Sequence, residues 1–177
     1  MSGTIQKTIL SEQDISGIVK RLGEQIASDY RDKEILVVGL LIGGVVFMAD
    51  LIRELSKQGI HCELDCIQIS SYEDLAESSG DIQLKKPESG SLADRHVLLV
   101  DEIVDTGYSL EFVQNYVQSK QPASFKTCVL LNKPSRRKID IHPDYVGTDI
   151  EDRFVVGYGL DYKGRYRELP YIALIDI

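Results

Sequence analysis

The sequence predicts an α/β fold in which helices flank both faces of a twisted, mostly parallel sheet. Short aliphatic runs, typical of strands buried on both faces, alternate with segments whose apolar residues recur every three or four positions. The length of 177 residues suits a single domain over residues 1–177. Because such sheets bind ligands beyond the carboxyl ends of their strands, we expect functional residues where each strand ends.

The individual elements follow from local patterns. Apolar residues at helical spacing, with Ser11 and Asp14 as a capping pair, predict a helix over residues 11–30. A second helix is expected from Gly43 and Gly44 to about Gln58, and a third over Leu110–Gln118. The expected strands are Ile35–Leu41, Cys62–Ile69, His96–Val100, Thr127–Leu131, Phe154–Tyr158 and Tyr171–Ile175. The polar, aperiodic segment of residues 73–94 indicates a disordered stretch or a functional lid.

Charge and cysteine content narrow the class of protein. The net charge of −8 disfavours nucleic-acid and anionic-membrane partners, because an acidic surface repels them. The three cysteines cannot pair completely and form no C-x-x-C, as expected in a reducing compartment. The longest apolar stretch, residues 35–51, is interrupted by glycines and Asp50, and the N-terminus lacks a signal-peptide core. We therefore expect a cytoplasmic protein.

The most informative stretch is Val97–Leu110. Four aliphatic residues lead into the adjacent carboxylates Asp101 and Glu102, and a turn with a third carboxylate, Asp105, then precedes a helix. The turn and the first helical positions supply Thr106, Gly107, Tyr108 and Ser109. Free N–H groups at a helix N-terminus, a glycine and hydroxyls suit a monophosphate, and the carboxylates suit sugar hydroxyls or Mg²⁺. A capped helix would explain the glycine and the serine, but not three carboxylates.

This stretch resembles the phosphoribosyl-diphosphate-binding signature of type I phosphoribosyltransferases: aliphatic residues, two acids, two aliphatic residues, then Asp-Thr-Gly. Pro143–Gly147 and Asp152–Tyr162 resemble the purine-binding segment of hypoxanthine-guanine phosphoribosyltransferases, and the resemblance runs from about residue 10 to the end. It implies a core of about residues 10–131, a hood formed mainly by residues 133–177 with N-terminal residues, and a mobile lid over about residues 70–94.

The resemblance also implies an activity. The enzyme would transfer the 5-phosphoribosyl group of 5-phosphoribosyl 1-diphosphate to N9 of hypoxanthine, guanine or both, forming IMP or GMP and pyrophosphate. It would use Mg²⁺ and form a homodimer or homotetramer. The alternatives are a xanthine-preferring enzyme and a regulator that binds phosphoribosyl diphosphate without turnover. A pyrimidine transferase is disfavoured because its base site would lack the pair of Lys133 and Phe154–Val155.

The resemblance assigns the roles in the phosphoribosyl half of the site. Asp105 corresponds to the general base, and the binding site for the phosphoribosyl group corresponds to Asp101, Glu102 and Asp105–Ser109. Leu41-Ile42-Gly43-Gly44 and Arg167 correspond to pyrophosphate-binding positions. Many relatives carry Lys where this chain has Ile42, and in the family the Leu41–Ile42 peptide can be cis. From the residues alone, a close strand–helix contact would explain the two glycines equally well.

The remaining roles concern the purine, the metal and the lid. The purine-binding positions are Lys133, Phe154, Val155 and Asp161, and the metal-associated carboxylates are Asp101, Glu102 and Asp161. Ser71 and Tyr72 correspond to the start of the lid. Without the resemblance, Lys133 would be read as solvated, Phe154 as part of the core and the lid as a surface loop.

Overall fold

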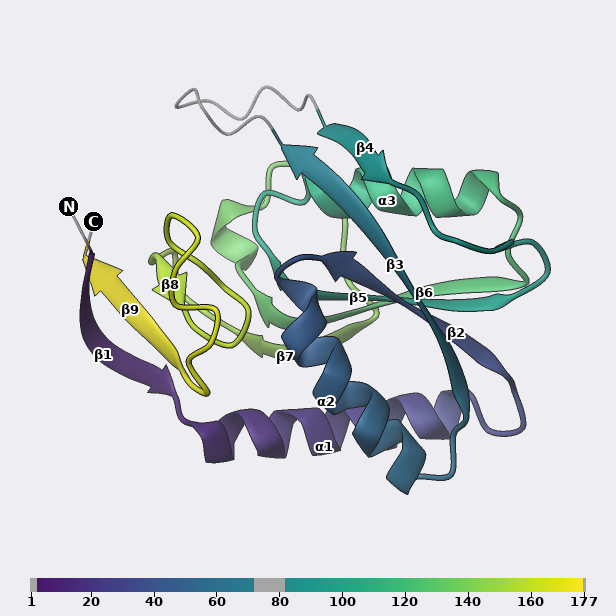
Figure 1. Ribbon diagram of the computed structural model, residues 1–177, viewed down its shortest axis with the longest axis horizontal. Helices are drawn as coiled ribbons and strands as arrows, with labels where there is room; N and C mark the ends of the chain where they lie inside the picture. The colour runs from purple at the N-terminus through teal and green to yellow at the C-terminus, as the bar shows by residue number, and fades with distance from the viewer. Residues whose placement is uncertain (1–2, 72–81, 177) are drawn as a thin grey trace.

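The computed structural model describes residues 3–71 and 82–176. A six-stranded sheet forms its centre (Figure 1), and it confirms the expected mostly parallel α/β fold. The strands are β2 (Ile35–Leu41), β3 (Cys62–Ser71), β4 (Ile82–Lys86), β5 (His96–Val104), β6 (Ser124–Asn132) and β7 (Tyr145–Asp149). Their order is β4-β3-β2-β5-β6-β7, and only β4 runs antiparallel to its neighbour.

Helices cover both faces of this sheet. Helices α1 (Glu12–Asp29) and α2 (Gly44–Lys57) pack on one face, and α3 (Tyr108–Ser119) packs on the other (Figure 1). Side chains alternate along a strand, so β5 contributes Leu98 to the core under α1 and α2 and Leu99 to the core under α3. Strand β5 therefore contributes to both apolar cores, one on each face of the sheet. None of the helices in the described part of the chain is long and apolar enough to cross a membrane.

Helix α1 begins at the predicted cap. The backbone N–H of Asp14 donates to the Ser11 hydroxyl at 3.2 Å, and the Ser11 N–H donates to the Asp14 carboxylate at 2.9 Å. This reciprocal pair satisfies N–H groups that have no partner within the helix. Ser11 is therefore the point at which the chain leaves the preceding strand, β1 (Thr4–Leu10), and enters α1.

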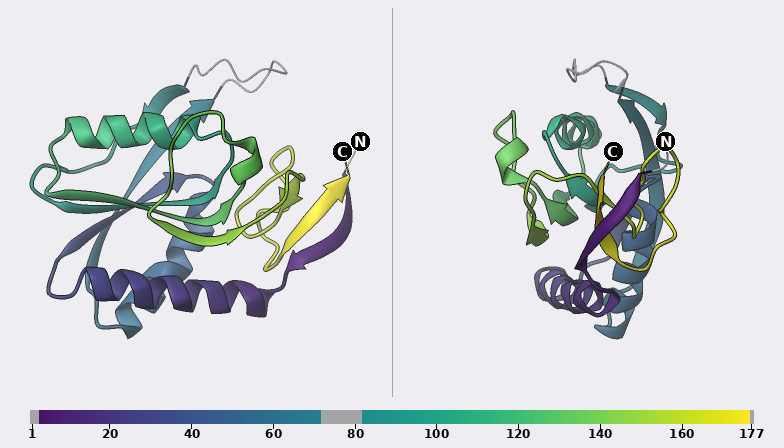
Figure 2. Two further views of the ribbon diagram at one scale, coloured as in Figure 1. Left: turned by 180° about the vertical axis from the view of Figure 1, so that it is seen from behind. Right: turned by 90° about the vertical axis from the view of Figure 1, so that its left-hand side faces the viewer.

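A second, three-stranded sheet lies at the end of the molecule toward which β2 and β5 run (Figure 2). Its order is β1-β9-β8, where β8 is Val155–Val156 and β9 is Ile172–Asp176. Strand β9 pairs antiparallel with both neighbours, so the two ends of the described chain lie side by side. A short 3₁₀ helix, η1 (Pro134–Arg136), follows β6. We refer to the three-stranded sheet and the loops of residues 157–171 as the hood.

The structure corrects three expectations about secondary structure. Strands β1 and β7 were not anticipated, and Ile82–Lys86 within the supposedly aperiodic segment forms β4, because it pairs with the end of β3. Strand β5 continues to Val104 instead of ending at Val100, because Asp101 and Ile103 still pair with β6. The carboxylates of Asp101 and Glu102 therefore lie within the last residues of β5 and not after it. The expected strand Phe154–Tyr158 shortens to two residues.

Candidate active site

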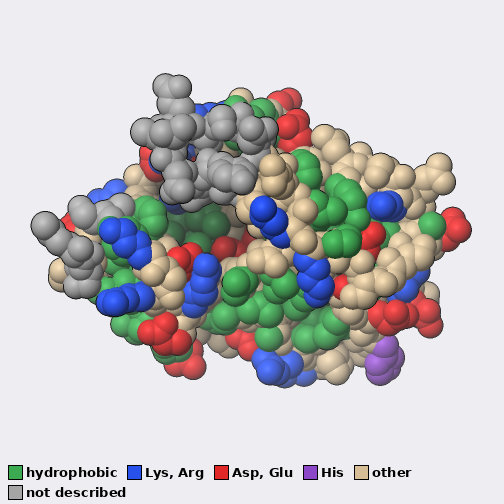
Figure 3. Space-filling view, turned by 45° about the horizontal axis from the view of Figure 1, so that its top comes forward, with side chains coloured by type: hydrophobic (Ala, Val, Ile, Leu, Met, Phe, Trp, Pro, Cys, Tyr) green, Lys and Arg blue, Asp and Glu red, His purple; other side chains and the backbone are tan. Residues whose placement is uncertain are grey.

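The predicted site residues converge at the carboxyl ends of β2, β5 and β6. In the sheet, β2 lies between β3 and β5. The chain continues from β2 to β3 on one side and later returns to β5 on the other side, so the order of the strands reverses between β2 and β5. In open α/β sheets, ligands bind at such a switch point. On the face shown in Figure 3, a hollow lies next to the grey residues, with acidic side chains within it and Lys or Arg side chains at its rim.

The turn after β5 forms a cradle at the N-terminus of α3. Gly107 is the N-cap of α3 and has φ +97, a conformation that L side chains rarely adopt. A Cβ at this position would lie 2.8 Å from Ile141 and 3.0 Å from Ile139. Glycine therefore lets the turn pack tightly while the backbone N–H groups of the first helical turn remain available to an anion.

Two carboxylates lie beside this cradle at the end of β5. Asp101 is buried, and its Oδ1 accepts a hydrogen bond from the Glu102 N–H at 2.9 Å. Burial first, and the neighbouring charge of Glu102 second, raise the pKa of Asp101 well above its usual value. Within the described residues, neither carboxylate has a Lys or Arg partner within 4 Å. Carboxylates without a cationic partner are suited to hydroxyl donors or to a divalent cation, which would also favour their ionised form.

The loop after β2 lies directly against these carboxylates. The Leu41–Ile42 peptide bond is cis, as the resemblance led us to expect. A Cβ on Gly43 would overlap the Glu102 carboxylate, and one on Gly44 would lie 3.1 Å from the Val100 carbonyl oxygen. The glycine pair thus makes the close strand–helix contact that we considered as one alternative. That contact also brings the backbone of the loop to the end of β5, where an anion could bind.

A loop of the hood closes the other side of the β2 loop. The Gly159 backbone touches that of Gly43, since a Cβ on Gly159 would lie 2.2 Å from the Gly43 carbonyl oxygen. Arg167 donates to the Gly159 carbonyl at 2.5 Å and pairs with Asp161 at 2.7 Å. Arg167 is therefore attached to the loop that faces the predicted pyrophosphate site.

The carboxylate of Asp105 lies among cations. Lys133, which follows β6, is buried, and its Nζ lies 3.5 Å from Oδ2 of Asp105. The Nε atom of Arg136 lies 2.6 Å from Oδ1 of the same carboxylate. Lys133 is thus held in the site and not solvated, because its ammonium has a carboxylate beside it.

The segment predicted to bind the purine precedes and includes β8. The Phe154 side chain is 42% exposed, so it is available to a flat ligand and is not part of the core. Tyr162 forms a T-shaped pair with it, with ring centroids 5.7 Å apart and planes at 81°. Val155 is buried in β8. Tyr162 was absent from the predicted set, because a single tyrosine in a loop gives no signal of what it contacts.

The structure brings together most of the predicted residues, with two qualifications. Asp161 is paired with Arg167 and does not join Asp101 and Glu102, and no group of three or more His, Cys, Asp or Glu within residues 3–71 and 82–176 is arranged to hold a metal. Ser71 ends β3, whereas Tyr72 lies outside the described residues.

Sequence reasoning missed the segment that supports the Asp105 turn. Backbone N–H groups of Lys133 and Lys138 donate to the carbonyls of Val104 and Thr106, at 2.9 and 3.0 Å. Arg137 donates to the Asp105 carbonyl at 2.6 Å. The run Lys133-Pro134-Ser135-Arg136-Arg137, three cations directly after a strand, was the available signal. It indicates a group of basic side chains at the ligand-binding edge of the sheet.

A separate groove of about 420 Å³ lies between α1 and β7. None of the predicted site residues lines it; its walls include Arg21, Asp29, Asp144 and Tyr145. Asp29 accepts hydrogen bonds from Tyr145 at 2.6 Å and from Lys126 at 2.7 Å, so its polar groups are already paired. The groove is therefore not the site at the strand ends.

The fold and these loops define a phosphoribosyl-binding α/β protein, and comparison with known proteins agrees. Residues 6–163 match the family described as "Phosphoribosyl transferase domain". The chain belongs to this phosphoribosyltransferase family.

Named relatives are close over nearly the full length. The chain is 42% identical to the hypoxanthine-guanine phosphoribosyltransferase of Staphylococcus epidermidis over 175 residues, which cover 99% of this chain and 96% of the relative. It resembles the crystal structure of a hypoxanthine phosphoribosyltransferase from Staphylococcus aureus with a TM-score of 0.92 and 41% identity, over 97% and 92% of the two chains. A hypoxanthine-guanine phosphoribosyltransferase structure from Bacillus anthracis also has a TM-score of 0.92, at 37% identity, over 99% and 100%.

Proposed function

We propose that this protein is a purine salvage enzyme that transfers the 5-phosphoribosyl group from 5-phosphoribosyl 1-diphosphate to N9 of hypoxanthine, guanine or both. The products are IMP or GMP and pyrophosphate. The names of the relatives support this choice of substrates. One structural observation favours it most: the Lys133 ammonium and the Asp105 carboxylate lie 3.5 Å apart. A 6-oxopurine presents an acceptor at O6 next to N7, and this pair could serve both atoms.

In the proposed binding mode, different loops bind the 5′-phosphate, the ribose and the pyrophosphate of phosphoribosyl diphosphate. The 5′-phosphate binds to the turn from Asp105 to Ser109, where the N-terminus of α3 offers free N–H groups. The ribose hydroxyls donate to the carboxylates of Asp101 and Glu102. Pyrophosphate binds to the backbone of the loop Leu41–Gly44 and to Arg167, whose guanidinium matches an oxyanion well.

The purine occupies the space beside Phe154, which stacks on the ring, and Val155 offers backbone groups to its edge. Lys133 donates to the 6-oxo group. As pyrophosphate leaves, positive charge develops on the anomeric carbon, N9 of the purine bonds to that carbon, and the proton on N7 of the same ring becomes more acidic. Asp105 takes this N7 proton and so acts as the general base.

A divalent cation fits the acidic end of β5. Asp101 and Glu102 would hold Mg²⁺, since their charges are unpaired within the described residues and carboxylate oxygens are the ligands this ion prefers. When bound, the ion would neutralise charge on the diphosphate and so ease its departure. Asp161 would contribute through Arg167 and not as a direct ligand, because the two side chains are paired at 2.7 Å.

The test is a direct assay with four bases. The purified protein is incubated with phosphoribosyl diphosphate, Mg²⁺ and hypoxanthine, guanine, xanthine or uracil, and nucleotide and pyrophosphate are measured. We expect turnover with hypoxanthine or guanine and none with uracil. Preference for xanthine would identify the first alternative. Tight binding of phosphoribosyl diphosphate without turnover of any base would identify the non-catalytic regulator and refute the proposal.

The assembly and the location are part of the same proposal. We expect a homodimer or homotetramer in the cytoplasm, acting on small molecules and on neither nucleic acid nor membrane. Light scattering coupled to gel filtration measures the assembly, and a monomeric mass for the active protein would contradict it.

A further inference from the structure

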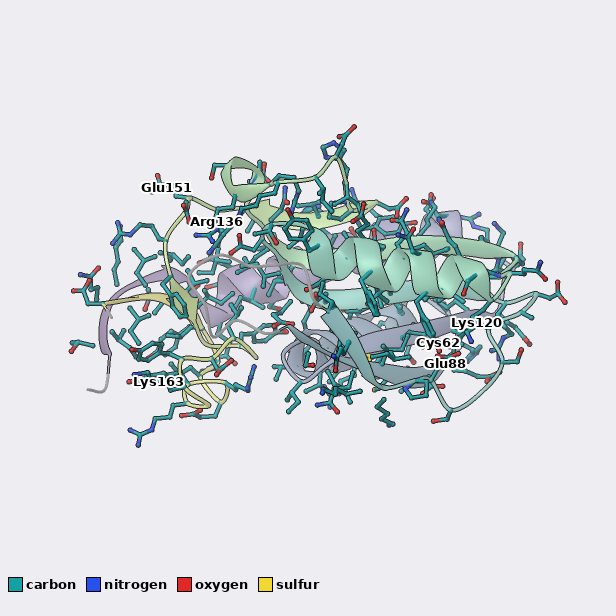
Figure 4. All side chains as sticks on the ribbon, turned by 90° about the horizontal axis from the view of Figure 1, so that it is seen from above. Cys62, Glu88, Lys120, Arg136, Glu151 and Lys163 are labelled. Carbon is teal, nitrogen blue, oxygen red and sulfur yellow. The ribbon has the colours of Figure 1, made fainter. Side chains whose placement is uncertain are left out.

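Arg136 joins two carboxylates from separate parts of the chain. Its Nε lies 2.6 Å from Oδ1 of Asp105, in the turn after β5, and its Nη1 donates to Oδ1 of Asp152 at 3.2 Å, in the segment that leads into β8. Figure 4 shows Arg136 close to Glu151, the neighbour of Asp152. The charge of Asp105 first, and the hydrogen bond to Asp152 second, raise the pKa of Arg136. The guanidinium therefore remains charged and bridges the Asp105 turn and the purine-binding segment.

The two oxygens of the Asp105 carboxylate have different surroundings. Oδ1 is inaccessible to solvent and forms an ion pair with Nε of the Arg136 guanidinium. Oδ2 lies 3.5 Å from the Lys133 ammonium, the group proposed to bind the purine 6-oxo atom. One oxygen is thus turned inward and the other is turned toward the proposed purine site.

The main chain of Asp105 is already fixed by other groups. Arg137 donates to its carbonyl, and the neighbouring carbonyls of Val104 and Thr106 accept from the segment after β6. What remains free is rotation about the side-chain bonds of Asp105. Within the described residues, Lys133 and Arg136 are the cations that contact its carboxylate. Once Lys133 turns to a purine, Arg136 is left to hold the carboxylate in place.

We propose that Arg136 is a positioning residue for the transfer reaction: it holds Oδ1 of Asp105 so that Oδ2 faces N7 of the purine. This inference rests on the proposed function and adds a residue to it. Asp152 anchors the guanidinium from the far side. Asp152 is two residues before Phe154. The same bridge therefore also fixes the position of Asp105 relative to the Phe154 ring that is proposed to stack on the purine. Small displacements of a reacting group can cost about 10²-fold in rate, so such a bridge has a measurable effect.

The experiment compares Arg136→Gln with Arg95→Gln in the Mg²⁺-containing assay with hypoxanthine or guanine. Arg95 is a matched control: it also forms an ion pair, with Glu63 at 2.9 Å, but it precedes β5 at the opposite end of the sheet. We expect Arg136→Gln to lower kcat by about 10-fold or more, while the KM for phosphoribosyl diphosphate changes less than about twofold. Arg95→Gln should retain wild-type kcat and KM.

Two further variants test the bridge itself. Asp152→Asn should lower kcat by less than Arg136→Gln does, because Arg136 keeps its contact with Asp105. When Arg136→Gln and Asp152→Asn are combined, the loss of kcat should be smaller than the product of the two single losses, since both changes remove the same support. Arg136→Lys should recover part of the rate, because an ammonium supplies the charge but cannot span both carboxylates. Melting temperatures of all variants show whether each one is folded.

The outcomes separate the inference from the proposed function. Absence of turnover by the wild-type protein would refute the proposed function, and with it any role for Arg136 in that reaction. If the wild-type protein is active and Arg136→Gln behaves as Arg95→Gln does, Arg136 is not a positioning residue. If the KM for phosphoribosyl diphosphate rises as much as kcat falls, Arg136 contacts that substrate or supports the whole turn, and the inference is wrong. If Arg136→Gln does not fold, the same criteria are applied to Asp152→Asn and Arg136→Lys.

Discussion

Substitution of Gly159 by alanine would disturb the contact between the hood and the β2 loop. Gly159 has φ +99, where an L side chain is strained, and its Cβ would lie 2.2 Å from the Gly43 carbonyl oxygen. The strain costs about 1–2 kcal/mol, and forcing the two backbones apart adds about 1–3 kcal/mol. At about 2–4 °C per kcal/mol for a chain of this size, we expect the melting temperature to fall by roughly 4–20 °C.

The matched control is Gly164→Ala in the same loop. Gly164 has φ +76, but no atom lies within 4 Å of the position its Cβ would take. It therefore reports strain without collision, and we expect a fall of only about 2–8 °C. Gly59→Ala, with φ +80, open surroundings and a position after α2, repeats that comparison away from the site.

The functional readout is the KM for phosphoribosyl diphosphate. Displacement of the Gly43 carbonyl moves the loop proposed to bind pyrophosphate, so Gly159→Ala should raise this KM several-fold, whereas Gly164→Ala and Gly59→Ala should leave it near the wild-type value. Differential scanning calorimetry and initial-rate kinetics provide both measurements. Equal melting temperatures for Gly159→Ala and Gly164→Ala, with equal KM values, would show that the two loops can separate freely and would refute this reasoning.

Three further outcomes follow from the site. Asp105→Asn should lower kcat about 10²–10⁴-fold in steady-state assays while the KM for phosphoribosyl diphosphate changes far less, because the amide cannot take a proton; a near-normal kcat would exclude Asp105 as the base. Excess chelator should abolish turnover and added Mg²⁺ restore it; full activity in chelator would exclude the metal. Burial raises the pKa of Asp101 in the folded protein, so its ionisation opposes folding above the pKa of the unfolded chain, near 3.8. In chelator, Asp101→Asn should therefore raise the melting temperature, by an amount that grows as pH rises from 4 toward neutral; a constant difference would contradict this.

The central strands of the sheet were predictable because they are buried on both faces and are therefore aliphatic almost throughout. Ile35–Leu41 is a continuous aliphatic run and forms β2 with the predicted bounds. The helix after Ser11 was equally clear, since the cap and the apolar spacing agree. The three strands that were missed lack such a pattern. Strand β1 has mostly exposed side chains, and β4 is a short, largely polar run. Backbone pairing holds both in place, β1 with the distant strand β9 and β4 with the preceding strand β3.

The site was predictable where chemistry is confined to one short segment and not where it depends on contacts between segments. The residues from Asp101 to Ser109 are contiguous, and their spacing indicates an anion cradle before a helix. The contact of Gly159 with Gly43, the pairing of Asp161 with Arg167, and the approach of Arg136 to Asp105 each join segments that only the fold brings together. Burial of Lys133 likewise depends on such neighbours and leaves no mark in the local sequence.

The place of β9 between β1 and β8 has a consequence for the order of folding during synthesis. Leu10, near the beginning of the described chain, pairs with Ile172, near its end, and Val155 pairs with Leu174 of the same strand. While the ribosome is still making the chain, the central strands can assemble with α1 and α2, but β1 and β8 have no partner until β9 has emerged. The hood sheet that follows Phe154 is therefore completed last, after the turn proposed to bind the 5′-phosphate has already been synthesised.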